Sequence, residues 1–288
     1  MPRVDLCVVI AARNEERHLA AQLDSLVAQV WSGDWEILVV DNGSTDGTVS
    51  IAEAFSAQHP RLRVLVATER ADKAYAVSAG LAGTTADAVV ICDADDVVTS
   101  GWLAAMAGGL ALHPVVTGPN ELDVLNPPWL AASRGRADEQ PVGSFAGLFP
   151  SVRGNNFGVR RAVWEQIGLL SADFYPCEDM EFSLRCQMNG IEVVGLPEAA
   201  VHYRYRSGAH QLWRQGFGYG SHRPRIARML VDAGRPRPAR LGGWKSWVML
   251  IVTLPTVVTR PGRARWLWIA GNRFGQVAGS IRYRTLML

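Results

Sequence analysis

Three carboxylates follow directly after a strongly apolar segment, about a third of the way along the chain. The segment spans residues 89–92, and Asp93, Asp95 and Asp96 come immediately after it. A continuous β-branched run predicts a buried parallel strand, and open α/β sheets bind ligands at the carboxyl ends of such strands. Clustered carboxylates repel one another unless a cation lies among them, and hard oxygen ligands suit Mg²⁺ or Mn²⁺. The motif therefore predicts a metal site for a phosphate-bearing ligand, with a solvated acidic turn as the alternative.

The elements around this motif alternate between strand and helix. Strands are predicted over residues 6–11, 36–40, 63–67 and 89–92, and helices after residue 14, up to residue 58, and over residues 72–81 and 100–112. Asn14 is expected to cap the first of these helices, with Glu15 in its first turn. Such alternation predicts an α/β fold with a mostly parallel sheet and right-handed crossovers.

The pattern loosens after residue 113. Residues 114–150 hold a strand over 115–117 and then a stretch rich in Pro, Gly and Ser, and a loop of this length is usually functional or mobile. Helices over residues 161–167 and 178–189 and strands over 191–194 and 199–203 complete this part of the chain. The segment of residues 216–220, Gly-Phe-Gly-Tyr-Gly, is not a dinucleotide loop because no strand precedes it. A phosphate-loop motif and a Ser/His/Asp nucleophile elbow are also missing from the sequence.

Four motifs in this order resemble the family 2 glycosyltransferases of the GT-A fold, over roughly residues 4–205. They are residues 8–16, residues 38–48, the Asp-Ala-Asp-Asp of residues 93–96, and Glu178-Asp179 with Ser183-Leu184-Arg185 after it. The resemblance implies that residues 1–205 form a catalytic domain that binds a nucleotide-diphospho sugar. Each motif stands at the end of its predicted element, as binding at the edge of a sheet requires.

The resemblance also implies roles for single residues. Nucleotide binding is expected of Ala11, Ala12, Arg13, Asn14, Glu15, Asp41, Lys73, Asp93 and Ala94. Asp41 would accept a hydrogen bond from the base, although an Asp in this position can also stabilise its own turn. Asp95 would hold Mn²⁺ or Mg²⁺ against the diphosphate. His202 is a candidate further ligand, with a packed, hydrogen-bonded histidine as the alternative. Asn155 and Asn156 are candidates for contact with the donor or acceptor sugar, or else turn residues.

Asp179 is the predicted catalytic base, and the adjacent Glu178 would assist it or bind the acceptor. A sugar hydroxyl is a poor nucleophile, and a carboxylate within hydrogen-bond reach that removes its proton typically contributes about 10²–10⁴-fold in rate. Attack from the face opposite the diphosphate would invert the anomeric carbon. The alternative is that both acids simply favour the positive end of a helix.

The chain departs from the family pattern at three places. Ala11-Ala12 stands where Pro is common, Asn42 where an acid is common, and Ser78 where Asn is usual. These departures leave the nucleotide pocket in place but weaken any inference about which base it binds.

The charge of the chain is divided unevenly. Residues 1–200 carry 13 Lys/Arg and 26 Asp/Glu, whereas residues 201–288 carry 16 Lys/Arg and a single acid, Asp232. The basic part also holds Trp213, Trp244, Trp247, Trp266 and Trp268. Its apolar runs, residues 247–258 and 266–281, are shorter or more interrupted than the roughly 20 residues of a spanning helix.

Residues 206–288 are therefore predicted to be a basic, Trp-rich helical extension that lies in the membrane interface. Attraction to anionic lipid would attach the protein peripherally to the inner face of the cell membrane. Packed core helices or a homo-oligomer interface are alternatives. A nucleic-acid surface is disfavoured because the acidic part would repel the same partner.

The four cysteines, Cys7, Cys92, Cys177 and Cys186, form no C-x-x-C pair, and the start of the chain leads straight into a strand. Both observations predict a reducing, cytoplasmic setting. The sequence as a whole predicts a metal-assisted, inverting glycosyltransferase that moves a sugar from a nucleotide-diphospho sugar, UDP-linked by the resemblance, to a hydroxyl of a glycan or glycolipid. A sugar-nucleotide-binding or scaffold protein without turnover is the alternative. A nucleotidylyltransferase is disfavoured because no Gly-rich triphosphate loop with Arg and Lys stands near the N-terminus.

Overall fold

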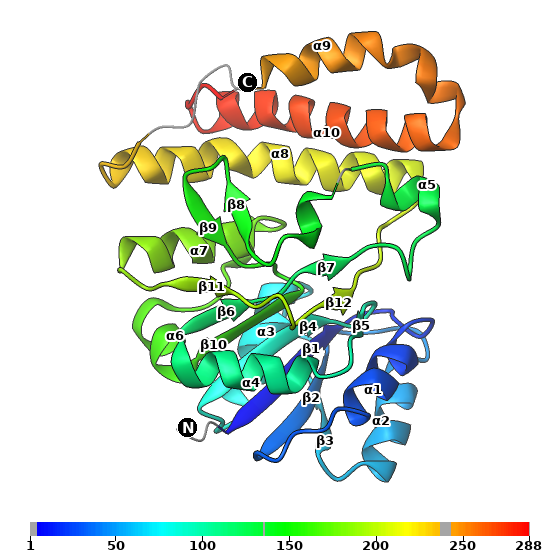
Figure 1. Cartoon of the computed structure of the whole chain (residues 1–288), viewed down its shortest axis with the longest axis vertical. Coiled ribbons are helices and arrows are strands. Elements are labelled where there is room, and N and C mark those ends of the chain that lie inside the picture. The colour runs from blue at the N-terminus through cyan, green and yellow to red at the C-terminus, as the bar shows by residue number, and fades with distance from the viewer. Residues whose placement is uncertain (1–4, 135, 237–242, 288) are drawn as a thin grey trace.

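The computed structural model describes residues 5–134, 136–236 and 243–287, and a seven-stranded sheet lies at its centre (Figure 1). The strand order is β11-β6-β10-β4-β1-β2-β3. The bounds are β1 Leu6–Ala12, β2 Trp35–Asp41, β3 Leu62–Val66, β4 Ala88–Asp93, β6 Val115–Thr117, β10 Asn156–Arg160 and β11 Val193–Gly195. Most neighbours in the sheet are parallel, as predicted, but β10 is antiparallel to both β4 and β6.

Strand β10 was not predicted. It has only two alternating large apolar side chains, Phe157 and Val159, both fully buried, and this is too short a pattern to distinguish a strand from a turn. β10 pairs with β4 on one side and β6 on the other, and this pairing stabilises a strand that its own sequence does not predict. β10 therefore brings the segment before it, residues 153–155, to the edge where β4 ends.

Helices cover both faces of the sheet, which explains why its central strands β1, β2 and β4 are mostly apolar and buried. The helices are α1 Leu19–Val27, α2 Thr48–Gln58, α3 Lys73–Ala82, α4 Trp102–Leu112, α6 Arg161–Ile167 and α7 Glu178–Met188. In β1, Val8 and Ile10 pack in one apolar cluster with α1, α2 and α4, whereas Cys7 and Val9 pack in a second with α3, α6 and α7. The strand thus contributes alternate residues to two cores.

The stretch of residues 114–150 is largely structured rather than a long loop. It contains β7 Asn120–Glu121, α5 Pro128–Ala131, the 3₁₀ turn η1 Ala137–Glu139 and the hairpin β8 Gly143–Phe145 with β9 Phe149–Ser151. β7 joins β5 Val97–Val98 and β12 Val201–His202 in a small sheet. Arg134 lies between the rings of Tyr205 and Trp268, at 4.2 and 4.0 Å from their centroids. These contacts tie the stretch to the C-terminal helices.

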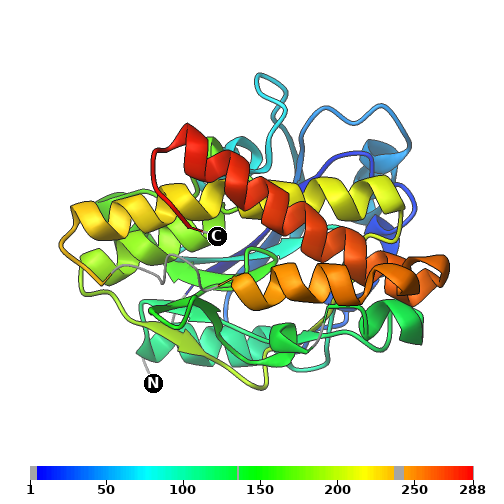
Figure 2. The ribbon, with the colours of Figure 1, turned by 90° about the horizontal axis from the view of Figure 1, so that it is seen from above.

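The C-terminal part forms a helical layer above the sheet domain (Figures 1 and 2). It consists of α8 Ala209–Asp232, α9 Trp244–Val252, the 3₁₀ turn η3 Leu254–Val258 and α10 Arg260–Arg282, and the 3₁₀ turn η2 Ala172–Phe174 lies below it, before α7. Ile226, Ala227 and Leu230 of α8 pack with Phe145 and Phe174 in one apolar cluster. α10 runs in the same direction as α8 and packs against it. α9 and η3 run back toward the start of α10, and α9 lies on the side of α10 away from α8 (Figure 1). The prediction that residues 266–281 lie in a membrane interface is wrong for the buried face of this segment, which packs on α8.

Glycines allow α8 and α10 to touch backbone to backbone. A Cβ added at Gly220 would lie 2.1 Å from the carbonyl oxygen of Asn272, and one at Gly275 would lie 2.2 Å from that of Phe217. The other glycines in this contact are Gly216, Gly271 and Gly279. The Gly-Phe-Gly-Tyr-Gly segment is thus part of a helix–helix contact of the kind that small residues permit. Among the described residues, no helix is both long enough and apolar enough to cross a membrane.

The glycine contact predicts opposite effects for two Gly→Ala substitutions within helices. Gly220→Ala should destabilise the protein by about 1–3 kcal/mol, because overpacking forces the two backbones apart. Gly108→Ala, on α4, where an added Cβ meets nothing within 4 Å, should stabilise it by about 0.5–1 kcal/mol. Urea unfolding of both variants measures the difference. Equal stability of the two variants would contradict this account of the α8–α10 contact.

Candidate active site

The parallel register places the ends of β1, β2 and β4 side by side. Ala12 is the partner of Asp41, and Ala11 is the partner of Asp93, so the first three predicted motifs meet at one edge of the sheet. This arrangement is the one expected from the sequence.

The loop after β1 is fastened to the loop after β2. Asn14 has a left-handed backbone (φ 57°), its Oδ1 accepts from Thr45 N at 2.8 Å, and its own N donates to Ser44 Oγ at 3.0 Å. Glu15 N donates to Thr48 Oγ1 at 2.7 Å. The expectation that Asn14 caps the following helix is wrong, because α1 begins only at Leu19 and the Asn14 side chain is used by the neighbouring loop. Arg13, between these contacts, is exposed.

Asp41 is buried, and its carboxylate accepts from Gly43 N at 3.1 Å and from Ser44 N at 3.2 Å. The turn-stabilising role is therefore present in the structure, and base recognition stays a prediction. Asn42 donates its amide to the carbonyl oxygens of Ala67 and Arg70, at 2.6 and 2.7 Å. A carboxylate could not donate to these carbonyls, which gives a physical reason for the departure from the family pattern at this position.

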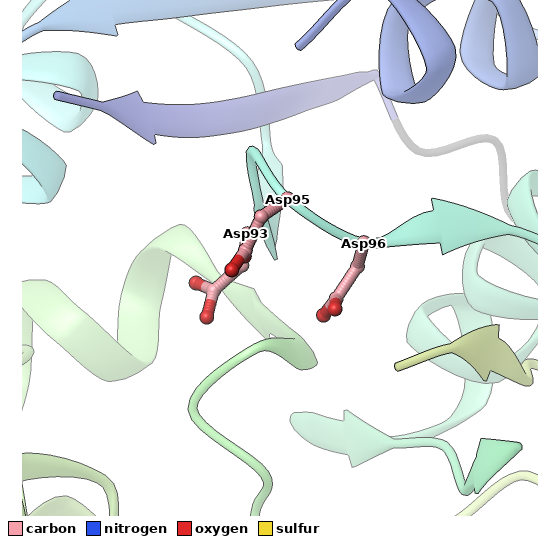
Figure 3. A group of neighbouring side chains, drawn as sticks. All are labelled: Asp93, Asp95 and Asp96. Carbon is pink, nitrogen blue, oxygen red and sulfur yellow. The ribbon is translucent and has the colours of Figure 1, made fainter. Parts of the chain in front are cut away.

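The three aspartates lie as predicted at the end of β4. Asp93, Asp95 and Asp96 each place an oxygen within 4.8 Å of the others, and their side chains point to the same side of the β4–β5 connection (Figure 3). Burial, then the charges of Asp93 and Glu15, raise the pKa of Asp95 to about 6. Burial and the two neighbouring aspartates also raise the pKa of Asp96. The structure therefore holds these carboxylates together against their mutual repulsion.

Contacts from behind hold the cluster in place. Gln22 of α1, fully buried, donates Nε2 to the carbonyl oxygen of Asp93 at 3.0 Å. Asp96 is fully buried and accepts from Asn155 Nδ2 at 2.8 Å and from Arg204 N at 3.0 Å. Sequence reasoning missed Gln22, because a glutamine on the inner side of an amphipathic helix gives no signal until its partner is known.

This donor set fits a divalent cation. The three carboxylates, with oxygens within 4.8 Å of one another, offer the hard oxygen ligands that Mg²⁺ and Mn²⁺ prefer. Asp93 and Asp95 are the partly accessible members, so they would hold the ion, with Asp96 beneath them. Bound there, the ion would supply positive charge next to a phosphate group.

The remaining predicted residues occupy different places. Ala94 is buried in the apolar cluster below the site. His202 is not in the carboxylate group, and its Nδ1 lies 2.9 Å from Glu121 Oε2 on the adjacent strand. Asn156 is fully buried, donates Nδ2 to the Ala199 carbonyl oxygen at 2.8 Å and accepts from Trp102 Nε1 at 2.9 Å. The amides of Asn155 and Asn156 are thus used inside the protein, and we assign neither residue to a sugar.

Lys73 and Gly154 connect the carboxylate cluster to Asp179. Lys73 Nζ donates to Asp93 Oδ1 and to the carbonyl oxygen of Gly154, the latter at 2.9 Å. Gly154 N in turn donates to Asp179 Oδ2 at 3.1 Å. Burial favours the neutral amine, but the charges of Asp93 and Glu178 outweigh it and raise the pKa of Lys73. The backbone of Gly154 therefore bonds both to the Lys73 ammonium group beside Asp93 and to the Asp179 carboxylate.

Glu178 and Asp179 begin α7, facing this connection. Burial raises the pKa of Asp179, against backbone hydrogen bonds from Met180 and Gly154 that lower it. Burial and the Asp179 charge raise the pKa of Glu178 to about 7. Glu178 is 6% exposed and its Oε2 has no hydrogen-bond partner among the described residues, whereas Asp179 is only partly buried. Asp179 is thus the more accessible member of the pair.

This mostly parallel α/β sheet, with acids clustered at the end of β4 and at the start of α7, has the architecture of the GT-A class of folds. Models of glycosyl transferase family 2 and of glycosyl transferase family group 2 match residues 7–121 and 88–271, and the chain belongs to this family. The mannosyltransferase PcManGT from Pyrobaculum calidifontis, solved with GDP-Man and Mn²⁺, superposes with a TM-score of 0.65 at 18% identity, covering 99% of this chain and 88% of that one.

One further solved structure and one sequence relative are also similar to this chain. Glucosyl-3-phosphoglycerate synthase from Mycobacterium tuberculosis, solved with Mn²⁺, UDP and phosphoglyceric acid, has a TM-score of 0.56 at 23% identity, covering 81% of this chain and 80% of that one. Beta-monoglucosyldiacylglycerol synthase of Synechocystis is 25% identical over 225 residues, 75% of this chain and 47% of that protein. The chain spans about a third to a half of the length of such curated relatives.

The raised pKa of Glu178 predicts how stability depends on pH. An acid whose pKa rises on folding, here from 4.5 to about 7, binds its proton more tightly in the folded state, so stability falls as pH rises between these values. Glu178→Gln removes this loss and should be more stable than the parent by about 1–3 kcal/mol at pH 8, since one pK unit corresponds to about 1.4 kcal/mol. At pH 4 the two should be equal.

Denaturant unfolding at both pH values tests this, with Glu165→Gln, on exposed Glu165 of α6, as the control. A stability difference for Glu178→Gln that does not change with pH would contradict the assignment.

Proposed function

We propose that this protein transfers a sugar from a nucleotide-diphospho sugar to an acceptor hydroxyl, with inversion at the anomeric carbon and with Mn²⁺ or Mg²⁺ as cofactor. The observation that carries the proposal is the Lys73–Gly154–Asp179 connection, which places a candidate base beside a candidate metal cluster. Family membership supports the reaction class. The Mn²⁺ in the mannosyltransferase structure supports the cofactor.

The residues divide the work as follows. Asp41 and the loop of residues 11–15 bind the nucleoside. Asp93 and Asp95 would hold a divalent ion, which would supply positive charge to offset that of the departing diphosphate. Asp179 takes the proton of the acceptor hydroxyl while its oxygen bonds to the anomeric carbon, and the bond to the diphosphate breaks on the opposite face. Gly154 N fixes the orientation of the Asp179 carboxylate, and Glu178 lies beside it at the start of α7.

We propose UDP as the carrier, because the family resemblance favours it and the phosphoglycerate synthase was solved with UDP. The GDP-Man in the mannosyltransferase makes guanine the second candidate. A thermal-shift panel of nucleotides and sugar nucleotides with Mn²⁺ and Mg²⁺ decides between them.

Two substitutions separate metal binding from proton transfer. Asp95→Asn should abolish the Mn²⁺-dependent thermal shift with the nucleotide, because one ligand charge is lost. Asp179→Asn should keep that shift and lose transfer, or donor hydrolysis, by about 10²-fold or more. Asp24→Asn, on the exposed side of α1, is the control.

Activity of Asp179→Asn close to the parent would remove it as the base. Nucleotide binding by the parent without any turnover would favour the alternative of a sugar-nucleotide-binding scaffold.

We further propose that the acceptor is reached at an anionic membrane surface, which α9 and η3 contact. Seven large apolar side chains of this segment are exposed: Trp244, Val248, Met249, Ile251, Val252, Leu254 and Val258, the last at 82%. Residues 233–288 contain ten Lys/Arg and no acid. Basic residues near anionic lipid contribute about 1 kcal/mol each, and apolar side chains among them suit the interface. The diacylglycerol in the name of the Synechocystis relative is consistent with a lipid acceptor.

Vesicle co-sedimentation tests this surface. The full chain should bind vesicles that contain phosphatidylglycerol and should be released by salt, with little binding to pure phosphatidylcholine. Ile251→Glu with Val258→Glu should reduce binding at least about tenfold. Val30→Glu, at an 87% exposed apolar position on the far part of the sheet domain, should not. Concentration-dependent dimerisation without vesicle binding would instead make this surface a homo-oligomer contact.

A further inference from the structure

Two arginines at the contact of α8 with α10, Arg273 buried and Arg223 partly buried, have no acidic partner among the described residues. Arg223 of α8 has a buried Nε with no hydrogen-bond acceptor. Arg273 of α10 is 8% exposed and donates to Asn272 Oδ1 at 2.9 Å. Within residues 5–134, 136–236 and 243–287, neither guanidinium forms an ion pair. Such groups are costly to bury unless a counter-charge or hydrogen-bond acceptors compensate them.

Other enclosed arginines of the chain are compensated. Arg153 pairs with Asp138 at 3.1 Å, and Arg185 pairs with Glu181 at 2.7 Å and also donates to backbone carbonyls. Arg134 stacks between two aromatic rings. The Nε atoms of Arg134 and Arg153 also lack a hydrogen-bond partner among the described residues. The difference is that Arg223 and Arg273 have neither an ion pair nor an aromatic ring contact in the described part of the chain.

The two charges also oppose each other. Burial and, after it, the charge of Arg223 lower the pKa of Arg273 to about 10. Burial likewise lowers the pKa of Arg223. A Cβ added at Gly220, one turn before Arg223, would lie 2.9 Å from the backbone N of Gln276, so Arg223 follows the turn of α8 that faces the turn of α10 with Arg273 and Gln276. Two like charges on facing turns favour an anion, and guanidinium groups match phosphate with paired N–H donors.

The arginine pair lies on the α8 side of the candidate base. α8 passes next to the start of α7, since a Cβ added at Gly218, five residues before Arg223, would lie 2.9 Å from Pro176 Cγ. Cys177 directly precedes α7, and its Sγ is 3.6 Å from the carbonyl oxygen of Tyr219. The loops expected to hold the nucleotide follow β1 and β2, at the sheet edge, whereas α8 belongs to the helical layer above (Figure 1). An acceptor would approach Asp179 from this layer.

Gln276 adds a further unpartnered group on the same face of α10. It follows Arg273 by three residues, so both side chains share one side of the helix. Gln276 is 2% exposed, and its Oε1 has no hydrogen-bond partner among the described residues. A ligand here would find two cationic donors and a neutral acceptor, which suits a phosphate group that carries a neighbouring hydroxyl.

We propose that Arg223 and Arg273 form a phosphate-binding subsite for the acceptor, with Gln276 beside it. That the ligand is an acceptor rests on the proposed transfer reaction, but binding of phosphate by this pair is independent of turnover. The phosphate would belong to a soluble phosphate ester or to a lipid headgroup, and the two share the same recognition chemistry.

Inorganic phosphate is the first probe, in a thermal-shift titration of the full chain with EDTA and constant ionic strength. Phosphate should raise the melting temperature of the parent. Arg223→Gln and Arg273→Gln should each weaken the apparent affinity at least about tenfold, because each removes a charged hydrogen-bond donor to the phosphate. Arg273→Lys should fall between. Arg228→Gln, on the exposed side of α8 and paired with Asp232, is the control.

The phosphate-induced change is compared within each variant, so a shifted baseline does not affect the result, and the Mn²⁺-dependent nucleotide shift shows that each variant is folded. Glycerol 3-phosphate in solution and vesicles with phosphatidic acid then distinguish the two sources. An unchanged phosphate shift in the Arg223→Gln/Arg273→Gln double variant would overturn the subsite and leave the nucleotide site standing. Loss of the nucleotide shift in the parent with an intact phosphate shift would overturn the proposed function alone.

Discussion

Repulsion among carboxylates is the constraint around which the site is built. Asp93, Asp95, Asp96, Glu178 and Asp179 gather at one edge, and burial raises the pKa of several of them. In the described part of the chain, Lys73 is the one basic side chain that forms an ion pair with any of these acids. Its second contact, to the carbonyl oxygen of Gly154, carries the same constraint to the Asp179 carboxylate. A cation and a diphosphate would meet a site whose charges are already placed.

The helical layer is positively charged, whereas the sheet domain is negatively charged. The sheet domain carries most of the acids, and the segment from residue 201 onward carries most of the arginines. The chain entering α8 already contributes to the acidic edge, since Arg204 donates its N to Asp96 and its Nε to the carbonyl oxygen of Asp95, at 3.0 and 3.1 Å. The uneven charge seen in the sequence thus corresponds to two layers, one with the carboxylate cluster at its edge and the other carrying Arg223 and Arg273.

The sequence predicted the parts of the site that follow from strand ends. Asp41, Asp93 and Asp95 meet because parallel strands end at one edge, and this follows from the alternation of elements alone. Contacts between residues that are far apart in the sequence could not be predicted from the sequence. Asn14 and Asn156 were given roles suited to loops, but the first bonds a neighbouring loop and the second lies inside. β10 was missed because five residues with two large apolar side chains carry little periodicity. The glycines of α8 gave no indication of their partner, since the matching residues lie some 50 positions later in the chain.

The direct backbone contact of α8 with α10 restricts how this protein can diverge. At Gly216, Gly220, Gly271, Gly275 and Gly279, any larger residue would meet a main-chain atom of the other helix. Drift in the C-terminal region is therefore confined to side chains that face outward or toward the sheet domain. A new preference for substrate would have to arise on those two faces, while the spacing of the helix pair stayed the same.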